Sequence, residues 1–240
     1  MSPAITIAKK EYGLSLRSLG TYIIFAIYLI AVGIYFALTA LRTGQAELRG
    51  VFSIMQTFFL FYIPAITMGS IAKERGSGTL ELISTLPVKL GHIVWGKWLA
   101  AWMLLGTVFL FTLVFLGLIA VFGSGVDYGA VFLGYLGLMC SGAAFIAIGI
   151  FASSLTSNQV LAFILALAIS GFFFLLGRLG ELIPLSIFSV IEYLGFDYHL
   201  QNFLKGVLDT RDLIYFAVVT YVFNLLAELR LQSQNLMQER

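Results

Sequence analysis

Long apolar runs alternate with short polar segments along this chain. Six of the runs are long enough for a transmembrane helix, which needs about 20 predominantly apolar residues. We expect these spans at residues 20–41, 51–71, 98–122, 129–152, 160–177 and 213–231. The pattern predicts an all-α polytopic membrane protein whose residues 1–240 form a single transmembrane domain.

Residues 1–19 precede the first span and are amphipathic. Apolar residues recur there at helical spacing: Ile5, Ala8, Tyr12, Leu16 and Leu19. Lys10 and Arg17 fall on another face. We therefore expect an interfacial helix on the membrane, with its cations near the lipid headgroups. A loose basic tail is the alternative.

The polar segment 72–97 separates the second span from the third. Its densest part, residues 73–87, reads KERGSGTLELISTLP. Ser77 or Thr79 is suited to cap a short helix, and Pro87 to end it. The apolar face of that helix carries Leu82, Ile83 and Leu86. A short amphipathic helix held between two spans is suited to dock on a partner.

Residues 178–212 are too polar and broken to cross a bilayer. Their apolar run from Ile183 to Leu194 is interrupted by Glu192, and runs of about 10–14 residues favour re-entrant or interfacial segments. We expect one or two short helices that dip into the outer leaflet.

Lysine and arginine predict the orientation, because they are enriched on the cytoplasmic side. If both termini are cytoplasmic, nine of these cations lie inside: Lys9, Lys10, Arg17, Lys73, Arg75, Lys89, Lys97, Arg230 and Arg240. Five lie outside: Arg42, Arg49, Arg178, Lys205 and Arg211. The asymmetry predicts a multi-pass membrane protein with both termini and segment 72–97 cytoplasmic.

Composition narrows the chemistry. The chain is 60% hydrophobic and 11% charged, with a mean hydropathy of +0.98, whereas soluble domains carry about 25% charged residues. A net charge of +2 is too small to indicate nucleic acid. The single Cys140 excludes an internal disulfide. We expect no catalytic residues, no cofactor and no metal, and interpret His92 and His199 as ordinary interfacial residues on opposite sides.

The predicted spans have no charged residue near their centres. Intramembrane charges usually serve ion or proton traffic, so their absence argues against a proton- or sodium-driven carrier. One run, Gly91–Lys97, matches the start of a phosphate-binding P-loop. Trp98 stands where that loop needs Ser or Thr, and the run leads directly into a span. We therefore expect no ATP binding or hydrolysis by this chain alone.

Small residues lie four apart on two spans, which permits close helix packing. They are Ala143 and Ala147 on the fourth span, and Ala162, Ala166 and Ser170 on the fifth.

The segment KERGSGTLELISTLPV after the second span, the start containing Lys10-Glu11 and the six spans together resemble permease subunits of ABC-2 type transporters. The gliding-motility-type branch is the most similar, because it shares an ending like FDYHLQNFLKGVLDTRDLIYF. A branch that serves nitrous-oxide reductase maturation is related. The sequence departs from the commonest family pattern at Gly76-Ser77-Gly78, a looser approach to the coupling helix.

The resemblance implies that two permease chains, as a homodimer or a related heterodimer, pair with two separate ATPase subunits. Residues 73–87 would be the coupling helix in an ATPase groove. Its contact residues would be Glu74, Arg75, Thr79, Leu80, Glu81, Leu82, Ile83 and Leu86. A second contact would use Ser154, Thr156, Ser157 and Asn158. The region 178–212 would cap the pathway on the outer side.

Three functions fit these observations. The first is the membrane half of an ATP-driven exporter. The second is a mechanical subunit that transmits ATPase motion to a periplasmic or outer partner without passing substrate. The third is an independent channel or secondary carrier. The sequence names no substrate, and the exposed aromatic residues suit membrane lipid and helix packing.

Overall fold

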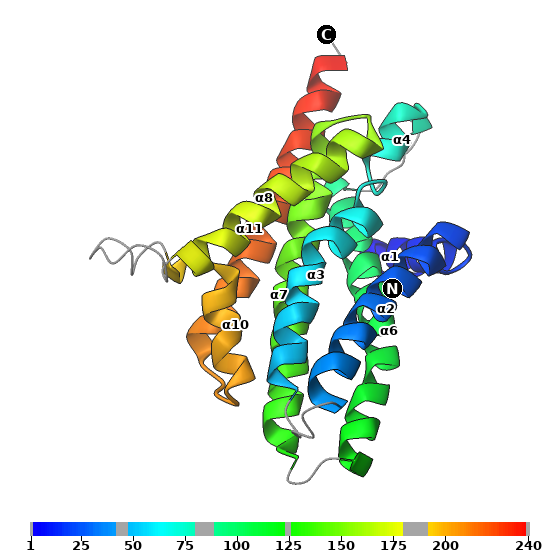
Figure 1. Ribbon diagram of the computed structural model, residues 1–240. Helices are drawn as coiled ribbons and strands as arrows, with labels where there is room; N and C mark the ends of the chain where they lie inside the picture. The colour runs from blue at the N-terminus through cyan, green and yellow to red at the C-terminus, as the bar shows by residue number, and fades with distance from the viewer. Residues whose placement is uncertain (1, 42–47, 80–88, 123–125, 180–191, 239–240) are drawn as a thin grey trace.

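The computed structural model describes residues 2–41, 48–79, 89–122, 126–179 and 192–238, and every element in these ranges is helical (Figure 1). The elements are α1 (Pro3–Leu16), α2 (Leu19–Phe36), the π-helical turn η1 (Ala37–Leu41), α3 (Arg49–Thr67), α4 (Ala72–Gly76), α6 (Leu90–Phe122), α7 (Tyr128–Leu155), α8 (Gln159–Leu179), α10 (Phe196–Leu204) and α11 (Thr210–Gln238). Six helices in the described ranges are long and apolar enough to cross a membrane. This confirms the predicted all-α polytopic membrane protein.

Helix α7 lies at the centre of the bundle and contacts α3, α6, α8, α10 and α11 (Figure 1). Residues 141–150 are all buried, as expected for a helix that is apolar on every side. Two glycines of α7, seven residues apart, allow side chains of neighbouring helices to pack directly against its backbone. A Cβ on Gly142 would lie 2.2 Å from Leu105 of α6, and one on Gly149 would lie 2.1 Å from Thr67 of α3.

The small residues noted on the fourth and fifth spans pack inside the chain. Ala147, Ala162, Ala166 and Ser170 are fully buried, and Ala143 is nearly so. They explain how α7 and α8 approach their neighbours, and they present no surface for a second chain.

Two spans are longer than the sequence indicates. α6 starts at Leu90, so the polar segment expected at 72–97 already contains its first two turns. The start expected at residue 98 is too late because Lys97, which ended the apolar run, is paired inside the protein. α11 runs to Gln238, well past residue 231, because its last turns are polar but still helical.

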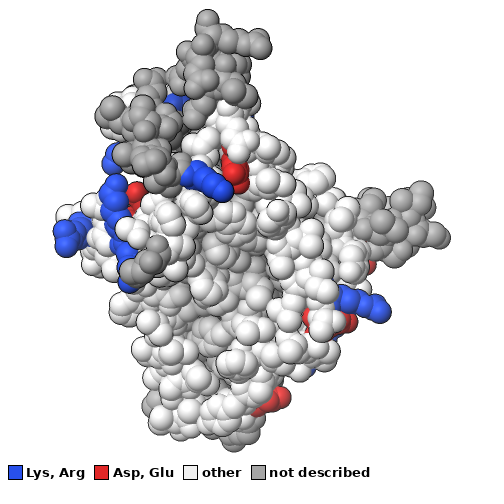
Figure 2. Space-filling model, turned by 180° about the vertical axis from the view of Figure 1, so that it is seen from behind, with Lys and Arg blue, Asp and Glu red and all other residues white. Residues whose placement is uncertain are grey.

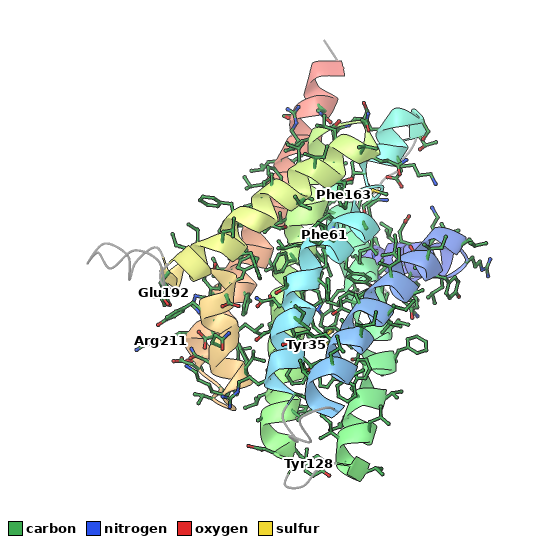
Figure 3. All side chains as sticks on the ribbon, viewed as in Figure 1. Tyr35, Phe61, Tyr128, Phe163, Glu192 and Arg211 are labelled. Carbon is green, nitrogen blue, oxygen red and sulfur yellow. The ribbon has the colours of Figure 1, made fainter. Side chains whose placement is uncertain are left out.

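The bundle has two distinct ends. α4, residues 156–158 and the last turns of α11 lie together at the top of Figure 1, which we call the α4 end. α10 lies beside the first turns of α11 in the other half, the α10 end, where Glu192 and Arg211 are found (Figure 3). On the face seen in Figure 2, the middle of the bundle shows a broad area without charged side chains. That area suits the hydrocarbon layer of a membrane.

The first helix lies across the bundle instead of along it (Figure 1). α1 packs on α6, where a Cβ on Gly96 would lie 2.8 Å from Ile7. Ala8 is fully buried, and the hydroxyls of Tyr12 and Thr107 are 2.8 Å apart. The segment is thus an ordered helix with one face on α6, which confirms the predicted helix and excludes the loose tail.

Candidate coupling site at the α4 end

The turn between α3 and α4 is held by a serine of the central helix. The backbone N–H groups of Ile71 and Ala72 both donate to Ser153 Oγ at 3.0 Å, and this hydroxyl donates to Met68 O at 2.9 Å. Ser153 is fully buried. One side chain therefore satisfies the backbone where the chain leaves the span, and it fixes α4 against the end of α7.

Glycines explain the close fit of α4. A Cβ on Gly76 would lie 2.9 Å from the carbonyl oxygen of Ser157, so α4 touches the loop between α7 and α8 directly. Gly78 has φ +72°, and its N–H donates to Arg75 O at 3.2 Å, which closes α4 with a left-handed residue. The Gly76-Ser77-Gly78 sequence that departs from the family pattern is thus a compact turn at the end of α4.

The hydroxyls expected to cap the following helix also close α4. Ser77 Oγ lies 3.0 Å from Lys73 O, and Thr79 Oγ1 donates to Glu74 O at 3.2 Å. The remainder of the predicted coupling helix, including Leu80, Glu81, Leu82, Ile83 and Leu86, lies outside the described residues.

A buried lysine ties three helices together. Lys97 of α6 is only 4% exposed, and its Nζ lies 2.6 Å from Glu74 Oε1 of α4 and 3.7 Å from Glu11 Oε1 of α1. Both carboxylates are largely covered. Since an unpaired charge is costly in such a place, each member of this Glu11–Lys97–Glu74 triad depends on the others.

Arg75, a second charged residue of α4, turns toward the last helix. Arg75 Nη2 donates to Gln234 Oε1 of α11, close to Arg230. Since Glu74 and Arg75 both bind within the chain, α4 is fixed to α6 on one side and to α11 on the other.

The loop after α7 is held in one conformation by side-chain to backbone hydrogen bonds. Asn158 Oδ1 accepts from Val160 N at 2.8 Å and so caps α8, while Thr156 Oγ1 accepts from Asn158 N at 3.1 Å. Ser154 is fully buried and donates to Phe151 O. The structure therefore places α4, the described start of the predicted first contact, beside Ser157 of the second, and Thr79, Ser157 and Asn158 are exposed.

Two polar arrangements escaped the sequence analysis. The sequence shows Glu11 only as an acid on the interfacial helix and Lys97 only as a lysine at the edge of a span, so nothing in it indicates that the two side chains meet. At the α10 end, His199 is fully buried in the protein, whereas the sequence led us to interpret it as an ordinary interfacial residue. Its Nδ1 lies 2.6 Å from Asp212 Oδ1 and its Nε2 lies 2.8 Å from Tyr193 O, while Asn202 donates to Asp212 Oδ2. Tyr215 stacks on its ring at 3.9 Å.

The other candidate sites in the described part of the chain offer no metal or phosphate site, and the main one is an apolar cavity. A cavity of about 630 Å³ lies between α6, α7 and α11, lined by Trp95, Trp98, Trp102, Met139, Cys140 and Thr220 among others. Within the described ranges, no group of three or more His, Cys, Asp or Glu is arranged to hold a metal ion. The P-loop-like run Gly91–Lys97 lies inside α6 and its lysine is paired with Glu74, so it lacks the strand–loop–helix geometry of a phosphate site.

Comparison with known proteins agrees with this architecture. The family described as ABC-2 family transporter protein matches residues 5–205, from α1 through α10. A search of curated proteins finds no match. A helical bundle with six helices long and apolar enough to cross a membrane is a polytopic membrane protein. The chain belongs to the ABC-2 transporter family and is a membrane permease of that family, whose members in general work with an ABC ATPase partner.

Proposed function

We propose that this permease couples ATP hydrolysis by two separate ATPase subunits to export, through residues 73–87 and 154–158. The observation that carries the proposal is the direct packing of α4 on the loop after α7, where Gly76 meets Ser157 O. The described parts of two segments that are far apart in the sequence, and that the family resemblance assigns to the ATPase, lie against each other there, which supports a shared docking site. Motion of a bound ATPase would reach α3, α6, α7 and α11 through α4.

The site is suited to transmit force because its connections are internal and polar. Glu74 and Arg75 fix α4 to α6 and α11, and Ser153 fixes it to α7. Each bond is lost if α4 moves independently, so displacement of α4 strains three spans together. The α4 end is cytoplasmic in this proposal, with both termini on that side of an inner membrane.

Assembly and branch belong to the same proposal. The family resemblance supports a homodimer or a related heterodimer of permeases, and residues 196–216 support the gliding-motility-type branch. ATP hydrolysis is assigned to the partner.

Copurification of the ATPase tests the proposal. Burying one leucine is worth ~1.5–3 kcal/mol, so Leu82→Ala with Leu86→Ala removes enough apolar contact to weaken a transient interface. We expect the double variant, and Glu81→Lys, to insert normally and to lose ATPase binding or stimulated hydrolysis. Glu192→Gln at the other end is the control and retains the ATPase. Full recovery and full activity with the double variant would refute the coupling role.

A further inference from the structure

The outward face of α1 has a composition distinct from its packed face. Ile7, Ala8 and Tyr12 lie on the side that meets α6. The opposite side exposes the cations Lys9, Lys10 and Arg17 together with the apolar side chain of Leu14, which is 53% exposed.

The outward face of α1 carries three exposed cations, and the helix's own acid points away from it. Glu11 is the only acid between residues 2 and 17. It is 26% exposed and turned toward the buried Lys97, at 3.7 Å. Because this carboxylate is directed inward, no acid of α1 offsets the exposed cations. Figure 2 shows Lys and Arg side chains gathered along the edge of the molecule on which α1 lies.

The position of α1 indicates what these cations meet. Leu19 begins the first span two residues after Arg17, and Leu19, Tyr22 and Ile23 are more than half exposed. A helix joined so closely to a span is held at the boundary between headgroups and acyl chains. Leu14 lies on the same face as Lys10 and Arg17, since the spacings are four and three residues. Apolar side chains beside cations suit insertion into that boundary.

We propose that the outward face of α1 binds the headgroups of anionic phospholipids, with Lys10 and Arg17 as the principal contacts. Each cation contacts phosphate, and Leu14 enters the acyl region between them. The proposal concerns a lipid site on the permease itself and does not depend on the ATPase. Since Glu11 of the same helix contacts Lys97, and Lys97 contacts Glu74, a lipid bound to α1 stabilises the helix that anchors α4.

Site-specific quenching tests this proposal on the purified chain in nanodiscs. In a Cys140→Ser background, a cysteine at the exposed Thr6 carries a fluorophore, and headgroup-spin-labelled phosphatidylglycerol or phosphatidylcholine is added at equal low fractions. A cation near the surface favours an anionic lipid about fivefold, so two should together produce a local preference of about 25-fold at low salt. Salt should reduce it, because the Debye length falls from about 30 Å at 0.01 M to about 3 Å at 1 M.

Matched variants separate this site from a general effect of charge. Lys10→Gln with Arg17→Gln should bring the ratio of quenching close to one. Lys205→Gln with Arg211→Gln, two exposed cations of the α10 end, should leave it unchanged. Lys10→Arg with Arg17→Lys should retain the preference, which shows that the helix tolerates substitution. A ratio of one in the native chain, or an equal loss in both glutamine variants, would overturn the proposal.

Discussion

Replacing Lys97 with methionine should destabilise the protein more than removing either of its partners. The substitution keeps the length and the apolar stem of the side chain and deletes the charge. Glu11 and Glu74 would then face each other across the vacated position, with most of both carboxylates covered. Removing one member of a buried pair costs about 3–5 kcal/mol. We expect the low end, about 3 kcal/mol, because both carboxylates keep some contact with solvent.

The partner substitutions give a graded series. In Glu74→Gln the amide oxygen still accepts from Lys97 and Glu11 still faces it, so the loss should be about 1.5–3 kcal/mol, the value of a hydrogen bond to a charged group. Glu11→Gln, whose contact is 3.7 Å long, should cost less than about 1 kcal/mol. Combining Lys97→Met with Glu74→Gln should be less harmful than the two costs added, since it removes an orphaned charge.

Denaturant unfolding of the purified chain in mixed micelles measures the series. The account requires the order Lys97→Met, then Glu74→Gln, then Glu11→Gln, and a double variant that recovers part of the sum. Full stability of Lys97→Met, or strict additivity in the double variant, would show that the triad is not a coupled buried unit.

Three further outcomes follow from the packing. Gly149→Ala should destabilise the bundle by about 1–3 kcal/mol, because its Cβ meets Thr67 at 2.1 Å, whereas Gly171→Ala, which has open space, should not; thermal unfolding compares them. Asp212→Leu should lower the unfolding temperature strongly because it leaves buried His199 without its carboxylate partner. The exposed Lys205→Gln should leave the unfolding temperature unchanged. An unchanged unfolding temperature in Asp212→Leu as well would contradict the buried His199–Asp212 pair. In a Cys140→Ser background, cysteine at Lys205 should react with an impermeant thiol reagent added outside, and cysteine at Ser157 should not; the reverse pattern would invert the topology.

The sequence predicts the spans well because their signal is local. A run of about 20 apolar residues must satisfy its backbone as a helix in lipid, whatever surrounds it. The ends of the spans are harder to predict, as α6 shows. A lysine such as Lys97 normally indicates that a span has ended, but here its ion pair with Glu74 allows it to be buried inside the helix bundle. A partner 23 positions away in the sequence leaves no periodic pattern that single-sequence reasoning detects.

The location of the candidate coupling site could be predicted from the sequence, but the contacts that hold it together could not. Charges and glycines mark residues 73–79 as special, but the reason for Gly76 is a carbonyl from residue 157, which only the fold supplies. His199 was misread for the same reason. Its partner Asp212 belongs to the next helix, and a histidine in a polar segment is otherwise expected to be exposed.

Photo-cross-linking from the α4 end tests the central claim most directly. A photoreactive residue is placed at Thr79 or at Ser157, both exposed and on the two adjoining segments, and at exposed Lys205 as the matched control. The intact complex is irradiated in its native membrane. The account predicts that both Thr79 and Ser157 cross-link to the ATPase subunit and that Lys205 does not. An ATPase cross-link from Lys205 with none from Thr79 and Ser157 would contradict it.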